Sequence, residues 1–163
     1  MTPRDLKTHK NAPKQLKDFP EFKARKRMQR PLKHVGGPRI SSTGMLEVSD
    51  THGVVMYWRD GQILTDRAFY GHLFCRLAGG SLGPIFEFHW HPNHKGIHCK
   101  TPCMTENDYT DRNLPGAPEL SIKTAHQYDP KKPDDLKMLV MIFCKSCGIS
   151  LPMSDQNTKP LWL

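Results

Sequence analysis

The residues from Pro84 to Cys103, PIFEFHWHPNHKGIHCKTPC, hold most of the side chains in this chain that could do chemistry. If Ile85 to His91 forms a β-strand, its side chains alternate between two faces. One face then carries Ile85, Glu87, His89 and His91, and the other carries Phe86, Phe88 and Trp90. Side chains two positions apart on a strand lie about 6.8 Å apart, so a carboxylate and two imidazoles can reach one ligand.

Two chemistries fit this polar face. His89 and His91 can act as general base and acid on a phosphodiester, with Glu87 orienting an imidazole and Arg76 or Lys95 stabilising the developing charge. Alternatively, the same three side chains and another histidine can bind a catalytic divalent metal. A non-catalytic reading also stays open, in which the face merely packs against another part of the chain.

The element most able to enlarge this face is the preceding alternating segment, Phe69 to Leu77. The connection Ala78 to Pro84, AGGSLGP, turns the chain back, so the two segments are predicted to form an antiparallel hairpin. If the polar faces of the two strands coincide, His72 and Arg76 join the candidate catalytic group. If they do not, only the residues of the second strand remain.

Cysteines form a second constellation. Cys99 and Cys103 are four residues apart, and Cys144 and Cys147 are three apart before Gly148, a spacing typical of a zinc knuckle. Four thiolates predict a closed, structural Zn²⁺ site that staples the loop to the C-terminal part of the chain. His94 or His98 can replace one thiol, and four unbound thiols are the competing interpretation. Cys75 is interpreted as a small buried hydrophobe.

The positive charge is confined to the start of the chain. Residues 1–39 contain 12 Lys/Arg against 3 Asp/Glu, whereas the remaining residues contain 12 against 13. This proline-interrupted segment, residues 1–40, is predicted to be a basic arm with one short helix from Pro20 to about Arg30. A basic surplus predicts binding to nucleic acid, although a solvated tail would have the same composition. The candidate contacts are Lys23, Arg25, Lys26, Arg27, Arg30 and Lys33.

Residues 41–163 are predicted to form a single β-rich domain. Short strands are expected at Met45–Ser49 and Gly53–Trp58, and the Asp60-Gly61 turn should lead into a strand over 62–65. Further strands are predicted at 120–124 within a long loop, at Lys137–Phe143 as a buried central strand, and at 149–151, pairing back across the cysteine turn. The fold class is therefore α+β and β-rich, with a small antiparallel sheet, a zinc-knuckle-like staple and the basic arm.

Composition excludes several classes of protein. No apolar run approaches the roughly 20 residues of a membrane span, and the Lys-rich N-terminus lacks the apolar core of a signal peptide. A cytoplasmic location is therefore expected, with reduced or metal-bound cysteines and no membrane partner. The sequence has no glycine-rich phosphate loop, nucleophile elbow or internal repeat.

These features favour a nucleic-acid-directed protein, a small ribonuclease of the toxin or defence type. RNA is the expected partner rather than DNA, and a cognate protein inhibitor is a further candidate partner. One alternative is a non-catalytic, zinc-containing module that binds nucleic acid or the ribosome. A second alternative is a metal-dependent enzyme that acts on a small molecule.

Overall fold

The structure, a computed structural model, describes residues 3–92, 96–100 and 128–152. Six strands form an antiparallel sheet in the order β2-β3-β4-β5-β6-β7, and a separate two-stranded parallel sheet pairs β1 with β8. The main sheet comprises β2 (Lys23–Ala24), β3 (Ile40–Glu47), β4 (His52–Arg59), β5 (Ala68–Arg76), β6 (Leu82–His91) and β7 (Gly96–Lys100). The remaining elements are α1 (Pro3–Asn11), β1 (Lys14–Gln15), a 3-10 turn at Leu64–Asp66, α2 (Pro133–Cys147) and β8 (Ile149–Ser150). The predicted α+β, β-rich class with an antiparallel sheet is confirmed.

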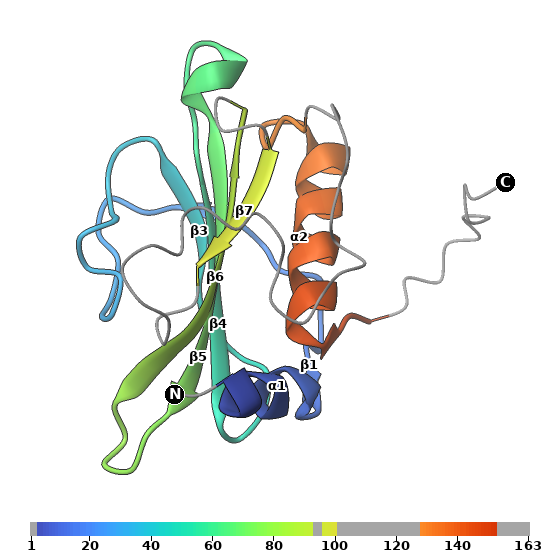
Figure 1. The fold of residues 1–163 in the computed structure, drawn as a ribbon. Coiled ribbons are helices and arrows are strands. Elements are labelled where there is room, and N and C mark those ends of the chain that lie inside the picture. The colour runs from blue at the N-terminus through green and yellow to red at the C-terminus, as the bar shows by residue number, and fades with distance from the viewer. Residues whose placement is uncertain (1–2, 93–95, 101–127, 153–163) are drawn as a thin grey trace, which may run out of the picture.

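Each face of the main sheet has its own hydrophobic cluster. Helix α2 packs on one face, where Phe88 and Trp90 of β6 meet Leu139 and Phe143 of the helix. Figure 1 shows α2 on this side of the sheet and the segment that precedes β3 on the other side. That segment contributes Met28 and Leu32 to the second cluster, which also includes Ile40, Val55, Tyr57 and Phe74. The histidine-bearing face of β6 is therefore the face covered by residues of the predicted arm.

The predicted strand at Lys137–Phe143 is wrong, because this run belongs to helix α2. Pro133 begins the helix, Asp134 and Asp135 lie in its first turn, and Gly148 ends it in the left-handed conformation with φ of 66°. Met138 and Met141 are partly exposed, whereas Leu139, Val140, Phe143, Cys144 and Cys147 are buried at helical spacing. Cys144 and Cys147 therefore lie in the last turn of a helix rather than in a hairpin turn.

Other predicted elements also differ. No helix spans 20–30, because Lys23–Ala24 pairs with β3 and the Arg25 N–H donates to the Ile40 carbonyl. Residues 149 and 150 pair in parallel with β1 instead of folding back across the cysteines. The predicted strand at 120–124 lies outside the described residues. Within the described residues, no helix is long and apolar enough to cross a membrane.

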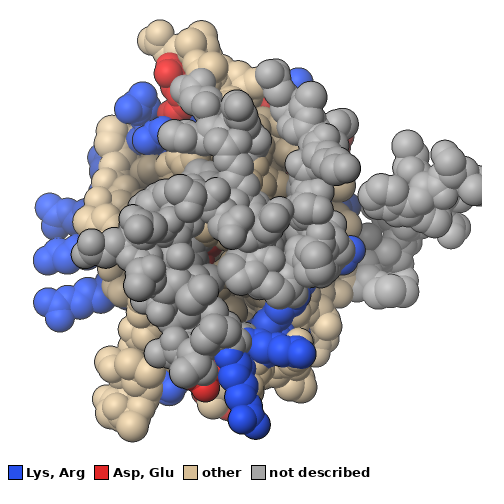
Figure 2. Space-filling view, viewed as in Figure 1, with Lys and Arg blue, Asp and Glu red and all other residues tan. Residues whose placement is uncertain are grey.

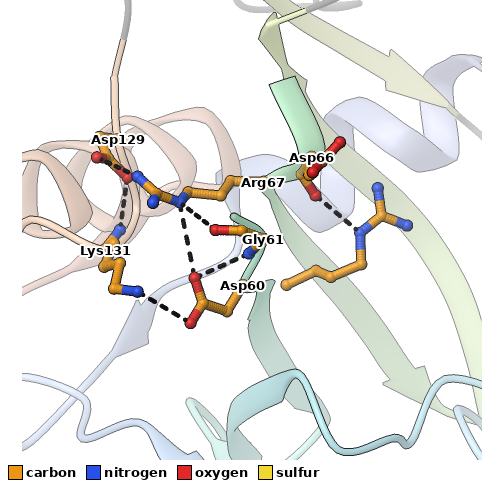
Figure 3. Close-up of polar contacts among 7 residues, drawn as sticks. Asp60, Gly61, Asp66, Arg67, Asp129 and Lys131 are labelled. Carbon is orange, nitrogen blue, oxygen red and sulfur yellow. Dashed lines mark hydrogen bonds and ion pairs between the residues drawn. The ribbon is translucent and has the colours of Figure 1, made fainter. Parts of the chain in front are cut away.

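The β4–β5 connection is a polar turn instead of the predicted strand at 62–65. Arg67 is the centre of this turn, because its guanidinium donates to the Gly61 carbonyl over 3.1 Å and to Asp129 Oδ2 over 2.6 Å (Figure 3). Asp60 lies 3.6 Å from Arg67 Nε and 3.2 Å from Lys131 Nζ. These contacts tie the end of β4 to the segment that leads into α2.

Gly71, in the middle of β5, allows α2 to approach the sheet closely. A Cβ atom at this position would lie 2.5 Å from Cδ2 of Phe143, which is fully buried. Glycine is therefore required here by packing and not by backbone conformation, since a side chain would force the helix outward.

We expect Gly71→Ala to lower the unfolding free energy by about 1–3 kcal/mol, the usual cost of overpacking a core. Gly37→Ala is the control, because its Cβ would meet only Ile40 Cγ1 at 4.0 Å. Denaturant unfolding of the two variants beside the native protein measures the difference. Equal stability of Gly71→Ala and Gly37→Ala would contradict the close packing of Phe143 on β5.

Candidate functional site

The histidine-bearing face is assembled by the pairing of β5 with β6. His72 lies directly opposite Glu87, and Tyr70 lies opposite His89. The register is thus the one in which the polar faces of the two strands coincide around Glu87. On the other side of β6, His98 of β7 is the register partner of His89.

Glu87 lies between two imidazoles. Its Oε2 atom is 3.3 Å from Nε2 of His89, and its Oε1 atom is 3.9 Å from Nδ1 of His72. All three side chains are shielded, with exposed fractions of 22% for Glu87, 14% for His89 and 7% for His72. A partly buried carboxylate within reach of an imidazole nitrogen, as Glu87 is of His89, orients the ring.

His72 is buried within a column of aromatic rings. It stacks between Tyr57, with ring centroids 5.5 Å apart, and Phe74, at 6.0 Å. Burial lowers the pKa of His72 to about 4, opposed by the charge of Glu87 and assisted by His89 and His34. Its Nε2 atom has no hydrogen-bond partner among the described residues. His72 is therefore neutral near pH 7, and it lies beside Glu87 as a buried aromatic ring rather than as a group that exchanges protons.

His91 completes a group of aromatic and imidazole rings at the end of β6. The rings of His89 and His91 are 6.0 Å apart between centroids, and Tyr70 lies 5.1 Å from each of them. Burial raises the pKa of Tyr70, an effect that the nearby Arg59 opposes. Tyr70 is therefore a neutral hydroxyl beside the two candidate catalytic imidazoles.

Tyr57, Arg59 and His34 lie near this face and were missed by sequence reasoning, whereas alternation along the predicted strand places Tyr70 on the face of His72. Tyr57 and Arg59 follow from extending the strand register by one more strand, because β4 pairs Tyr57 with Tyr70. Arg59, two positions further on, interacts electrostatically with both tyrosines. His34 reaches His72 from the segment before β3, a placement that no local sequence pattern indicates.

Two residues lie elsewhere than predicted. Arg76 is four positions beyond His72 and pairs with Glu47 over 3.2 Å at an exposed site, so it is not in contact with Glu87 in the structure. Ile85 does not share the face of Glu87, because a bulge in β6 disturbs the pairing between Phe86 and Pro84. Ile85 is buried with Phe86 in the cluster beneath α2.

The six basic candidates for nucleic-acid binding all have exposed side chains. Figure 2 shows Lys and Arg side chains gathered along the edge of the molecule formed by the segment preceding β3. Lys23 lies 3.6 Å from Glu21, whereas Arg25, Arg27 and Arg30 have no carboxylate partner among the described residues. This segment is folded against the sheet through Met28 and Leu32, so its charges have fixed positions beside the histidine-bearing face.

The described cysteines of the predicted zinc site are in the hydrophobic core. Cys99 of β7 and Cys144 and Cys147 of α2 are each less than 5% exposed. Burial raises the pKa of Cys144 to about 12, and burial together with neighbouring thiols raises the pKa of Cys99 and Cys147 further. The effect of Cys147 on Cys99 indicates that β7 and the end of α2 bring these thiols near one another.

A complete metal site is not formed by the described residues alone. Among residues 3–92, 96–100 and 128–152, no three His, Cys, Asp or Glu side chains have an arrangement that could hold a metal ion. Cys103 and His94 lie outside these residues, so the predicted fourth ligand and one of its substitutes are not described.

Comparisons of the chain with protein-family models, with curated proteins and with solved structures gave no match. Its function is therefore argued from the residues and their geometry.

Burial of neutral histidines predicts a loss of stability in acid. The pKa values of His72 and His52 are lowered by burial to about 4, below their ordinary value of 6.5. The unfolded chain thus binds protons that the folded chain does not, so stability is full above pH 6.5 and falls towards pH 4. The loss should reach roughly 3 kcal/mol at most for each histidine, at about 1.4 kcal/mol per pKa unit.

Urea unfolding of His72→Gln between pH 7 and pH 4 tests this expectation. The variant should lose less stability over this range than the native protein, whereas His34→Gln, at an exposed position, should resemble the native protein. An unchanged pH dependence in His72→Gln would show that His72 is not buried as a neutral group.

Proposed function

We propose that this chain is an RNA-directed acid–base enzyme, a small ribonuclease that works without a catalytic metal. The observation that carries the proposal is the carboxylate of Glu87 held between the imidazoles of His72 and His89. An oriented imidazole next to a second histidine is the basic requirement of proton transfer in phosphodiester cleavage. The basic segment before β3 supports RNA as the substrate, because it lies across the same face of the sheet.

The chemistry assigned to the pair is transesterification. His89, which is oriented by Glu87, accepts the proton of a ribose 2′-hydroxyl, and the 2′-oxygen attacks the adjacent phosphorus. The bond from phosphorus to the 5′-oxygen breaks, and His91 donates a proton to that oxygen, which leaves a 2′,3′-cyclic phosphate. Each imidazole must reach an oxygen within about 2.6–3.2 Å, and the 6.0 Å between the ring centroids suits two oxygens on one phosphorus.

The other members of the face have supporting roles in this proposal. His72 forms the buried wall on one side of Glu87, and Tyr70 offers a neutral hydroxyl to the phosphate. Arg59 takes the charge-stabilising role that the sequence analysis gave to Arg76, because it interacts with Tyr70 on the same face.

A structural zinc ion is a separate part of the proposal. Cys99, Cys144 and Cys147 have the ligand chemistry of a zinc site, with Cys103 as the fourth thiolate. Bound zinc would fasten the edge strand β7 to the end of α2. If the chain has no RNA-cleaving activity, this cluster and the basic segment favour the second candidate function, a zinc-containing module that binds nucleic acid.

The proposal also includes a cellular location, a protein partner and a third candidate function. A reducing, cytoplasmic location suits a protein in which four of the five cysteines are assigned to metal binding. A ribonuclease active in that compartment would require a cognate protein inhibitor. A metal-dependent enzyme is the third candidate, favoured by the buried and unpartnered Nε2 atom of His72.

The catalytic proposal predicts cleavage of single-stranded RNA in the presence of EDTA. Glu87→Gln, His89→Ala and His91→Ala should each lower the rate by about 10²–10⁴-fold, the usual contribution of positioned acid–base catalysis. Glu47→Gln is the matched control for the carboxylate, because Glu47 is exposed and only pairs with Arg76. The cleavage rate is followed by the release of the cyclic phosphate product.

The inactive variants should melt at the same temperature as the native protein, so that their loss of activity cannot come from unfolding. The enzyme proposal fails if native protein leaves RNA intact, or if His89→Ala and His91→Ala both cleave it at the native rate. Cleavage that stops in EDTA while the fold persists would favour the metal-dependent enzyme instead.

The zinc proposal predicts one zinc ion per purified chain, measured by elemental analysis. Cys144→Ser and Cys147→Ser should lose that ion and melt at lower temperature, because the free energy of metal binding contributes to folding. Cys75→Ala is the control, since it removes a buried thiol outside the proposed ligand set. A metal-free protein whose melting temperature is insensitive to chelation would rule out the zinc site.

A further inference from the structure

A small cavity lies between the basic segment and the start of the sheet. Its volume is about 260 Å³, slightly below the roughly 300–1,000 Å³ of typical ligand pockets, so it suits one small unit of a ligand. Its walls combine apolar side chains from both sides with polar groups. The lining residues are Arg25, Arg27, Met28, Gln29, Arg30, Leu32, Thr43, Gly44, Met45 and Val55.

The charge of this cavity is of one sign. Arg25, Arg27 and Arg30 line it, and none of its lining residues is acidic. Guanidinium groups bind phosphate through charge-assisted and frequently bidentate hydrogen bonds. Met28, Leu32 and Val55 are buried and form an apolar wall, against which a flat ring can pack. The cavity therefore offers guanidinium groups for the phosphate of a nucleotide and an apolar wall for its base.

The backbone around the cavity is arranged to admit these arginines. A bulge in β3 between Ser42 and Met45 places Gly44 at the wall with φ of 69°. A Cβ atom there would lie 3.2 Å from Nη2 of Arg25, so the bare glycine leaves room for the guanidinium. The segment is held in place by the hydrogen bonds from Arg25 N–H to the Ile40 carbonyl and from Gly37 N–H to the Arg25 carbonyl.

The cavity and the histidine-bearing face belong to one side of the sheet. Val55, in the cavity wall, is the register partner of His72, and His72 is the register partner of Glu87. Two strand spacings therefore separate Val55 from Glu87, roughly 10 Å at about 4.8 Å per strand, and His89 lies about 6.8 Å further along β6. Val55 and His89 are thus roughly 12 Å apart, and at roughly 3.4 Å of helical rise per nucleotide a strand of about three to four nucleotides covers this distance.

We propose that this cavity, the arginine pocket, is a nucleotide-binding subsite that holds one nucleotide of an RNA strand about three to four positions from the bond presented to His89 and His91. The inference rests on the proposed function for the identity of the strand. In this proposal the basic segment is a binding site with a defined position rather than an arm that attracts nucleic acid only through its charge.

Titration of the full chain with adenosine and uridine 5′-monophosphates, followed by calorimetry, tests the pocket without RNA cleavage. Arg25→Gln and Arg27→Gln should each weaken binding by about 10-fold, the loss expected for one charge-assisted hydrogen bond. Arg39→Gln is the matched control, because Arg39 belongs to the same basic segment, is exposed and does not line the cavity. It should change the affinity by less than about 2-fold, as expected for a surface charge.

Inorganic phosphate and adenosine, titrated separately, identify what the pocket recognises. Each should bind more weakly than the mononucleotide, because each fills only one part of the cavity. Arg30→Gln supplies a third pocket variant if either of the others alters the melting temperature. The proposal is overturned if Arg39→Gln weakens binding as much as the pocket variants, if phosphate alone binds as tightly as the nucleotide, or if no nucleotide binds.

The result also separates the pocket from the proposed catalysis. If nucleotide binding depends on Arg25 and Arg27 but the chain cleaves no RNA, the proposal of the arginine pocket stands and the proposal of a ribonuclease fails. If the chain cleaves RNA in EDTA but these substitutions leave its nucleotide affinity unchanged, the proposal of a ribonuclease stands and the proposal of the arginine pocket fails.

Discussion

The pairing of His72 with Glu87 across β5 and β6 is the contact on which the candidate site depends. Shifting the register by one residue would turn the carboxylate and both β6 imidazoles towards α2, where Phe88 and Trp90 now pack. Phe143 also stabilises this register, because it fits only over Gly71, the register partner of Phe88. The packing of the hydrophobic side of the sheet thus fixes the geometry of the polar side.

Much of the sheet was predictable because its signals are local. Alternating residues and glycine-rich turns predicted the β5–β6 hairpin and the separation of Phe88 and Trp90 from Glu87 and His89. Alternation could not locate the bulge at Ile85, because an extra residue leaves no mark on the pattern. Nor could it predict that His34 influences the pKa of His72, since these residues are 38 positions apart in the sequence.

The C-terminal helix and the basic segment were mispredicted for different reasons. An apolar run such as 137–143 fits a buried strand or a buried helix, and the exposed Met138 and Met141 make it look apolar on every side. Pro133, two aspartates and Gly148 were the helix signals that could have decided the question. The basic segment was predicted to be an arm because Lys and Arg dominate its composition. Met28 and Leu32, which anchor the segment to the sheet, are isolated apolar residues among these charges and give no recognisable pattern.

The parallel pairing of β1 with β8 joins Lys14 to Ile149, two residues that are distant in sequence. Closing so long a loop carries a large entropic cost before any contact is gained, so this pairing is expected late in folding and early in local unfolding. Lys14 is buried beside it, and its ammonium group donates to the carbonyls of His9, Lys10 and Ala12. β8 directly follows Cys147 at the end of α2, whereas the hairpin that carries Glu87 and His89 is formed by hydrogen bonds between β5 and β6. Separation of β1 from β8 is therefore expected to alter the surroundings of Cys147 and to leave the hydrogen bonds of the hairpin in place.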